Sequence, residues 1–160
     1  MYFPYWDEEG TLTFWMGRAM KTVIEPKTIE PDNASKPLYG RHVTKLSGIL
    51  PPLLVEGVFD HFVTPSSYAL MGSGITGSQI ATLRLDGVRT VALLQDPDAS
   101  ESMKMNSKKM GKFGIKSHMV MLSGDKDPAM IGANKMADIV THIQSEIAKK
   151  MLITTIHISV

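Results

Sequence analysis

The chain has 160 residues, 43% hydrophobic and 21% charged, with a formal net charge of +1. These values are typical of a soluble globular chain with an apolar core, and they exclude nucleic-acid binding through bulk positive charge. Because the sequence has no cysteine, we expect no zinc site in this chain and a reducing, cytoplasmic location. It has no run of 18 apolar residues, so we expect no membrane partner.

The N-terminal part of the chain predicts β-structure. Residues 2–6 and 11–16 are short apolar runs on either side of a turn at residues 7–10, which is the pattern of a β-hairpin. Residues 25–37 hold three prolines and predict a loop or linker. We therefore assign residues 1–45 to a short β-rich unit.

Residues 46–160 predict an α/β domain, because short apolar strands alternate with helical patterns. The expected strands cover residues 53–55, 68–71, 90–94, 116–122 and 153–160, and the expected helices cover residues 57–63, 77–85, 99–113 and 129–151. Thr76 is placed to cap the second helix, which Asp86 and Gly87 end. The alternation predicts a mostly parallel sheet with helices on both faces.

Three carboxylates follow two of the predicted strands. Glu56 comes directly after residues 53–55, and Asp96 and Asp98 come directly after residues 90–94. Ligands of open α/β sheets bind at the carboxyl ends of the strands, and carboxylate oxygens suit Mg²⁺. The pattern therefore predicts a divalent-metal site. A simpler alternative is that Asp98 or Ser100 only caps the following helix.

Four ordered segments resemble the motifs of Toprim domains. They are residues 55–60 (VEGVFD), 69–76 (ALMGSGIT), 91–99 (VALLQDPDA) and 122–128 (LSGDKDP). The preceding segment resembles the stretch that leads into the Toprim domain of bacterial-type (DnaG-like) DNA primases. It holds Phe3-Pro4, residues 14–20 (FWMGRAM), Pro26-Lys27 and residues 38–40 (LYG). The resemblance implies a Rossmann-like Toprim fold, preceded by a β-rich remnant of a primase N-terminal subdomain.

The resemblance also implies roles for individual residues. Glu56 would be an acid/base residue or metal ligand, Asp96 and Asp98 metal ligands, and Asp60 and Asp127 further members of the acidic pocket. Arg18 and Lys27 would lie on a basic surface for the template or nucleotide phosphates. The implied cofactor is Mg²⁺ or Mn²⁺. The sequence departs from the family where the downstream loop reads Asp127-Pro128-Ala129 instead of Asp-Pro-Asp.

The function implied by the resemblance is synthesis of RNA primers from NTPs on single-stranded DNA. A split or phage-encoded primase is expected, with a replicative helicase and a zinc-binding module on other chains, in a bacterial or phage-infected cell. Two alternatives stay open. One is a metal-dependent Toprim nuclease, and the other is a non-catalytic Toprim module that binds nucleic acid or supports assembly.

Overall fold

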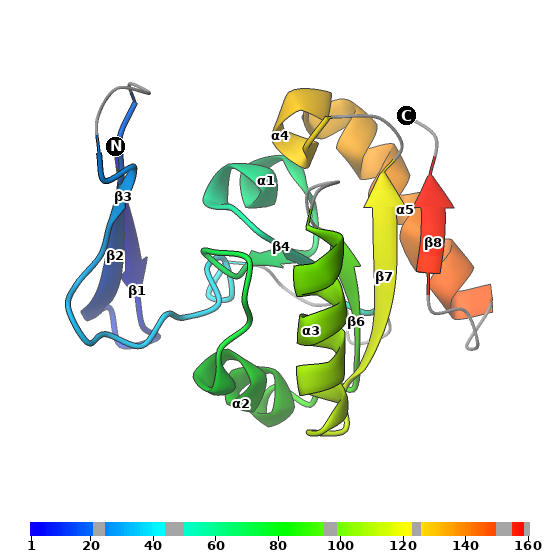
Figure 1. Ribbon diagram of the computed structural model, residues 1–160, viewed down its shortest axis with the longest axis horizontal. Helices are drawn as coiled ribbons and strands as arrows, with labels where there is room; N and C mark the ends of the chain where they lie inside the picture. Colours follow the sequence, from blue (N-terminus) through cyan, green and yellow to red (C-terminus); the bar gives the residue numbers. More distant parts are fainter. Residues whose placement is uncertain (21–24, 44–49, 95–98, 123–125, 150–154, 159–160) are drawn as a thin grey trace.

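The computed structural model describes residues 1–20, 25–43, 50–94, 99–122, 126–149 and the backbone of 155–158 (Figure 1). These residues form a three-stranded antiparallel sheet and a five-stranded sheet. The predicted boundary between residues 45 and 46 lies outside the described residues and stays a prediction. None of the described helices has the length and apolar character that a bilayer crossing requires.

The N-terminal sheet contains the predicted hairpin. Strands β1 (Tyr2–Trp6) and β2 (Leu12–Arg18) pair antiparallel. A short strand, β3 (Thr28–Ile29), pairs with the end of β2, inside the segment predicted as a loop. The inner face buries alternate residues, among them Phe3, Tyr5 and Phe14, as the two-residue period of a strand requires.

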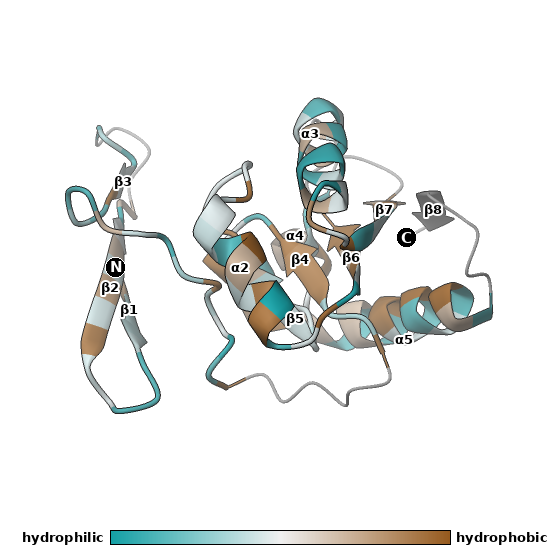
Figure 2. Cartoon of the chain, turned by 90° about the horizontal axis from the view of Figure 1, so that it is seen from below, coloured by the Kyte–Doolittle hydropathy of each residue, from teal (hydrophilic) through white to brown (hydrophobic). Residues whose placement is uncertain are grey.

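The second sheet confirms the predicted, mostly parallel sheet, since all of its strands run parallel. Its strand order is β5-β4-β6-β7-β8, and each neighbouring pair is parallel. The bounds are β4 (Leu53–Val55), β5 (Ser67–Ala69), β6 (Thr90–Leu94), β7 (Lys116–Leu122) and β8 (Thr155–Ile158). Strand β4 is fully buried, and the continuous apolar character of β4 and β6 is visible in Figure 2. Such strands are expected where a parallel sheet is covered on both faces.

Within the described ranges, five helices surround this sheet. They are α1 (Val58–Val63), α2 (Gly77–Leu85), α3 (Ser100–Gly111), α4 (Pro128–Ile131) and α5 (Ala133–Lys149). The predicted cap of α2 is confirmed, because Thr76 Oγ1 accepts a hydrogen bond from the Gln79 amide at 3.2 Å. The single helix predicted over residues 129–151 is wrong. Gly132 has a φ of 86° and separates α4 from α5.

The helices cover both faces of the parallel sheet, which confirms the predicted layers. On one face, Leu53 and Leu94 pack with Val58 of α1 and apolar residues of α5. On the other, Leu54 and Leu93 pack with residues of α2 and α3. Neighbouring residues of each strand thus point into different cores, as the pleat dictates.

The inner face of the N-terminal sheet packs against α1. The ring of Phe3 meets the ring of Phe59 edge-on, with the centroids 5.3 Å apart, and the ring of Tyr39 at 6.4 Å. Phe3, Tyr5 and Phe14 belong to the same buried cluster as Val58 and the core of α5. The small sheet therefore completes its core with residues of the α/β part.

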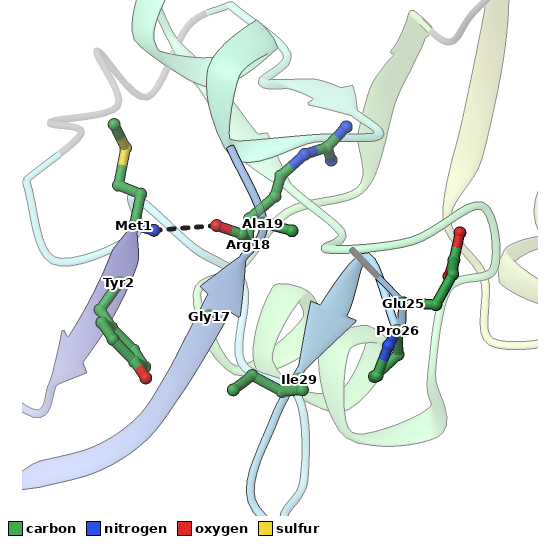
Figure 3. A pocket seen from close by; sticks show the side chains of 8 residues that line it. All are labelled: Met1, Tyr2, Gly17, Arg18, Ala19, Glu25, Pro26 and Ile29. Carbon is green, nitrogen blue, oxygen red and sulfur yellow. Dashed lines mark hydrogen bonds between the residues drawn. The ribbon is translucent and has the colours of Figure 1, made fainter. Parts of the chain in front are cut away.

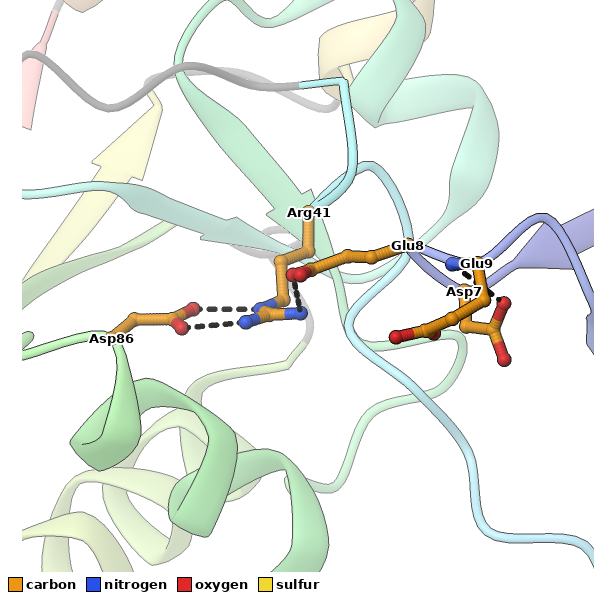
Figure 4. A network of polar contacts seen from close by, with 5 residues as sticks. All are labelled: Asp7, Glu8, Glu9, Arg41 and Asp86. Carbon is orange, nitrogen blue, oxygen red and sulfur yellow. Dashed lines mark hydrogen bonds and ion pairs between the residues drawn. The ribbon is translucent and has the colours of Figure 1, made fainter.

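Residues 38–40 join the two sheets. Tyr39 exchanges two backbone hydrogen bonds of 3.0 Å with Ala69, so it extends the parallel sheet at its β5 edge. Gly40 has a φ of 88°, and a Cβ there would collide with the imidazole of His61. Arg41 then bonds both oxygens of Asp86, at the end of α2, and lies 3.3 Å from Glu8 in the hairpin turn (Figure 4).

Candidate active site

The strand order places the two acidic strand ends side by side. Strand β4 pairs in parallel with β6, with Leu53 opposite Ala92 and Leu54 opposite Leu93. The strand that leads to Glu56 thus ends beside the strand that leads to Asp96 and Asp98. Those two aspartates lie outside the described residues, so the meeting of the three carboxylates stays a prediction. The strand adjacency that it requires is confirmed.

Glu56 is half-buried at the carboxyl edge of the sheet. Its carbonyl accepts a hydrogen bond of 3.2 Å from the amide of Gly72. Gly72 belongs to residues 71–76, which follow β5 and are called the glycine loop below. Gly72 has a φ of 148°, a backbone conformation that favours glycine. The hydrogen bond ties the glycine loop to the residue predicted to be catalytic.

Asp60 lies one helical turn beyond Glu56 and is buried, with 8% of its surface exposed. Its Oδ2 accepts from the amide of Gly57 at 3.0 Å, and its Oδ1 accepts from the amide of Ala129 at 3.3 Å. The carboxylate therefore caps α1 and also ties α1 to α4. A carboxylate that accepts amide hydrogen bonds at a helix N-terminus is stabilised there without a metal.

Asp127 has a similar local role at the start of α4. Its Oδ1 accepts a hydrogen bond of 2.7 Å from the amide of Met130, which makes Asp127 the N-cap residue of that helix. The contact between Asp60 and Ala129 brings the two acidic elements together. Metal binding by Asp60 and Asp127 stays a prediction.

The donor chemistry of this edge fits a hard divalent cation, which binds carboxylate oxygens. Within the ranges that the structure describes, however, no group of three or more histidines, aspartates and glutamates is placed to hold a metal. Glu56 supplies one half-buried carboxylate there. A complete site at this edge therefore depends on Asp96 and Asp98.

The predicted basic residues Arg18 and Lys27 come together where β2 ends and β3 is about to begin. Arg18 pairs with Thr28 across β2 and β3, and the amide of Ala19 donates to the carbonyl of Lys27 at 2.9 Å. The guanidinium of Arg18 lies over the ring of Phe59, 5.7 Å from its centroid. Phe59 immediately precedes Asp60, so this stacking places a cation beside α1. Arg18 and Lys27 are both exposed.

A pocket next to these residues is mainly apolar. Figure 3 shows it between the end of β2 and β3, with the side chain of Arg18 directed away from Tyr2 and Ile29. Its other lining residues are Met1, Gly17, Ala19, Glu25 and Pro26. Arg18 is the one basic side chain among these described lining residues, and Glu25 adds a carboxylate, so the pocket lacks the set of basic side chains that an anionic ligand would need.

Lys36, which was not among the residues predicted from the sequence, lies near the carboxyl edge of the sheet. Lys36 Nζ donates to the carbonyl of Met71 at 3.2 Å and lies 2.9 Å from Glu30 Oε2. Met71 precedes Gly72, whose amide bonds Glu56. Lys36 is therefore held beside the glycine loop. Lys36 lies in the proline-rich segment predicted as a loop, where no hydrophobic periodicity points to a functional side chain. The one feature in the sequence that marks it is its place, with Pro37, directly before residues 38–40.

His61 belongs to the joint between the sheets. Its Nδ1 is 3.0 Å from Ser67 Oγ, and that hydroxyl donates to the carbonyl of Thr64 at 2.6 Å. The serine hydrogen is thus used, so Nδ1 is the donor to Ser67. Burial lowers the pKa of His61. These contacts support a structural role for this histidine.

The sequence matched no protein-family model and no curated protein. Among solved structures, the chain is similar to the crystal structure of the Aquifex aeolicus primase, described as its zinc-binding and RNA polymerase domains. The TM-score is 0.71 at 20% sequence identity, over 91% of this chain and 39% of the primase chain. At this identity the likeness shows a shared fold. The chain spans about two fifths of the chain that it matches.

The extent of the match is informative about the N-terminal sheet. Residues 46–160 alone would leave more of the chain unmatched than the 91% coverage allows. The match therefore does not depend on the parallel sheet alone. The chain has a Rossmann-like α/β fold, consistent with the expected Toprim fold, with a small antiparallel sheet before it.

Proposed function

We propose that this chain is the catalytic core of a DnaG-like DNA primase, which joins NTPs into RNA primers on single-stranded DNA. The observation that carries the proposal is the pairing of β4 with β6, which ends the Glu56 strand beside the strand leading to Asp96 and Asp98. The fold shared with the Aquifex aeolicus primase supports it.

The acidic edge has the chemistry that nucleotide transfer requires. We propose that Glu56, Asp96 and Asp98 hold Mg²⁺ or Mn²⁺, with Asp60 and Asp127 in the surrounding acidic pocket. When bound, such an ion polarises phosphoryl oxygens and neutralises charge that develops during transfer. The hydrogen bond from Gly72 holds the Glu56 backbone, so the direction in which this side chain leaves β4 is set by the fold.

Three cations are proposed to bind phosphates around this edge. Arg18 is fixed over Phe59, and Lys36 is held at the carbonyl of Met71. Lys27, just before β3, has an exposed side chain. We propose that the template or an incoming nucleotide lies along these residues. Because each lysine or arginine contact with a nucleic-acid phosphate releases counterions, binding should weaken as salt is raised.

The proposal includes partners and a location. A zinc-binding module and a replicative helicase are proposed to act with this chain in the cytoplasm of a bacterial or phage-infected cell. The matched Aquifex aeolicus chain includes zinc-binding as well as RNA polymerase domains, and the similarity covers 39% of it.

Replacement of the proposed catalytic carboxylate tests the function. Glu56→Gln keeps the size of the side chain but removes its charge, and we expect primer synthesis to fall by at least about 10²-fold. Primers are measured with NTPs, single-stranded DNA and Mg²⁺ or Mn²⁺. The matched control is Glu101→Gln, because Glu101 is an exposed glutamate of α3 that pairs with Lys104. This control should keep full activity.

Two other outcomes would contradict the primase function. Metal-dependent cleavage of nucleic acid without NTPs would identify a Toprim nuclease that uses the same carboxylates. If the double variant Asp96→Asn, Asp98→Asn functioned as well as the wild type, these carboxylates would not be catalytic. The chain would then be a non-catalytic module.

A further inference from the structure

Asn106 is a polar residue on the buried side of helix α3. It has 3% of its surface exposed and lies between the buried Met103 and Met110. Asparagine is a poor helix former, and a buried amide is costly unless it is hydrogen-bonded. An apolar side chain would suit the helix better at this position, so the contacts of Asn106 are the reason to consider a specific role.

Both ends of the Asn106 amide bond the glycine loop. Oδ1 accepts from the amide of Ile75 at 2.9 Å, and Nδ2 donates to the carbonyl of Ser73 at 2.7 Å. A backbone amide can only donate and a carbonyl can only accept, so these partners fix the orientation of the side-chain amide. One turn further along α3, Lys109 Nζ donates to the carbonyl of Ile75. Helix α3 therefore binds three backbone groups of the loop.

The glycine loop has its other end at the acidic edge. The amide of Gly72 bonds the carbonyl of Glu56. The first turn of α3 begins at Ser100, two residues after Asp98 in the sequence. A continuous set of hydrogen bonds thus runs from Glu56 through the glycine loop to α3. The hydrogen bonds of the sheet align β4 with β6. They end with the strands, so they do not restrain the residues that follow.

We infer that Asn106 is a positioning residue, which locks the glycine loop to α3 and so fixes Glu56 relative to the start of that helix. The inference rests on the proposed function, since it assigns Asn106 a role in the geometry of the proposed metal site. Residues that orient metal ligands without touching the metal commonly change metal affinity by about 10–100-fold when replaced.

The test compares two buried amides that bond backbone carbonyls in different parts of the fold. Asn106→Leu removes the bonds to the glycine loop and places an apolar side chain of similar size in the same buried position. The matched control is Gln144→Leu. Gln144 is buried on α5 and donates to the carbonyl of Pro51, before β4 and therefore away from the carboxyl edge. Binding of Mn²⁺ alone to the full chain is measured by electron paramagnetic resonance, with Glu56→Gln as reference, and thermal melting reports stability.

We expect Asn106→Leu to weaken Mn²⁺ binding about tenfold. Gln144→Leu, which loses one long bond of 3.5 Å, should lower the melting temperature by a smaller amount and change Mn²⁺ affinity less than about twofold. Hydrogen exchange of the Ile75 amide should accelerate in Asn106→Leu alone. Equal loss of affinity in both variants would overturn the inference, because it would reduce Asn106 to a general stabilising role.

A second variant covers the case in which Asn106→Leu does not fold. Lys109→Met removes the neighbouring bond to Ile75, and we expect a weakening of Mn²⁺ binding of about threefold. Unchanged affinity in that variant would contradict the inference. A wild-type chain that binds Mn²⁺ through Glu56 but makes no primers would overturn the primase function and leave the positioning role standing on the binding data. A wild-type chain that binds no Mn²⁺ would overturn both.

Discussion

The two sheets of this chain obtain their cores in different ways. The parallel sheet is covered on both faces, and Leu53, Leu54 and Leu93 have no exposed surface. The N-terminal sheet buries one face only, because its other face leaves 68% of Tyr2 and 44% of Trp6 exposed. The small sheet therefore depends on α1 and on residues 38–40 for its stability, while the parallel sheet has a core of its own.

The difference also separates the proposed chemical roles. The carboxylates come from the strand ends of the parallel sheet, where buried strands define the backbone positions. The cations Arg18 and Lys27 come from the N-terminal part of the chain, and Arg18 lies over Phe59, the residue of α1 before Asp60. A mutation at the joint between the sheets should therefore affect phosphate binding more strongly than it affects the positions of the carboxylates.

The largest effect is expected from removing the main contact of that joint. Phe3→Ala deletes a buried ring that meets Phe59 and Tyr39, and it should lower the free energy of unfolding by about 3–5 kcal/mol. Urea denaturation measures the change. Tyr2→Ala removes an exposed ring of the outer face and should cost much less. Equal losses of unfolding free energy in the two variants would mean that the inner face does not hold the N-terminal sheet to the α/β part.

A smaller effect is expected at Gly40, within the joint. Gly40→Ala combines a positive φ with a collision between the new Cβ and the ring of His61. We expect a loss of about 2–3 kcal/mol. Gly10 in the hairpin turn has a similar φ of 78° but open space around a Cβ. Gly10→Ala should therefore cost about 1 kcal/mol. Both variants carry the cost of a positive φ, so the difference between their losses in melting temperature reports the collision of the Gly40→Ala Cβ with His61.

The smallest effect concerns pH. Burial lowers the pKa of His61 in the folded chain, so the unfolded chain binds the proton more tightly. The stability that the neutral imidazole contributes is fully present above the ordinary histidine pKa of about 6.5 and is lost as pH falls below it. Urea denaturation at pH 7.5 and 5.5 should show a larger acid loss for the wild type than for His61→Gln. The exposed His142 of α5 provides the control, and His142→Gln should keep the acid sensitivity of the wild type.

Much of the parallel sheet could be predicted from local signals. Residues 90–94 and 116–122 were strands with the predicted bounds because apolar runs ended at glycine or proline. Helix α2 began and ended as predicted because Thr76 and Asp86 flank it. Strand β3 was missed, since two residues carry no periodicity. The break at Gly132 was missed because the helical spacing of apolar residues continues across it.

The candidate site was predictable only in part. The place of Glu56 followed from one apolar strand, and the pairing of β4 with β6 agrees with it. The contact between Asp60 and Ala129 was not predictable, because the two residues are 69 positions apart in the sequence. Lys36 and Asn106 were missed for the same reason, since the backbone groups that they bond belong to a loop whose path is set by the tertiary fold.

The strand order has a consequence for synthesis of the chain on the ribosome. Strand β4 lies between β5 and β6, so one of its two neighbours is made well after it. At roughly 5–20 residues per second, the interval between Glu56 and the end of β6 lasts several seconds. Once Gly72 has been made, Glu56 can have its backbone partner in the glycine loop, but the neighbouring strand on the other side of β4 is still missing. The acidic edge is therefore assembled late, and the proposed metal site needs residues made after β6.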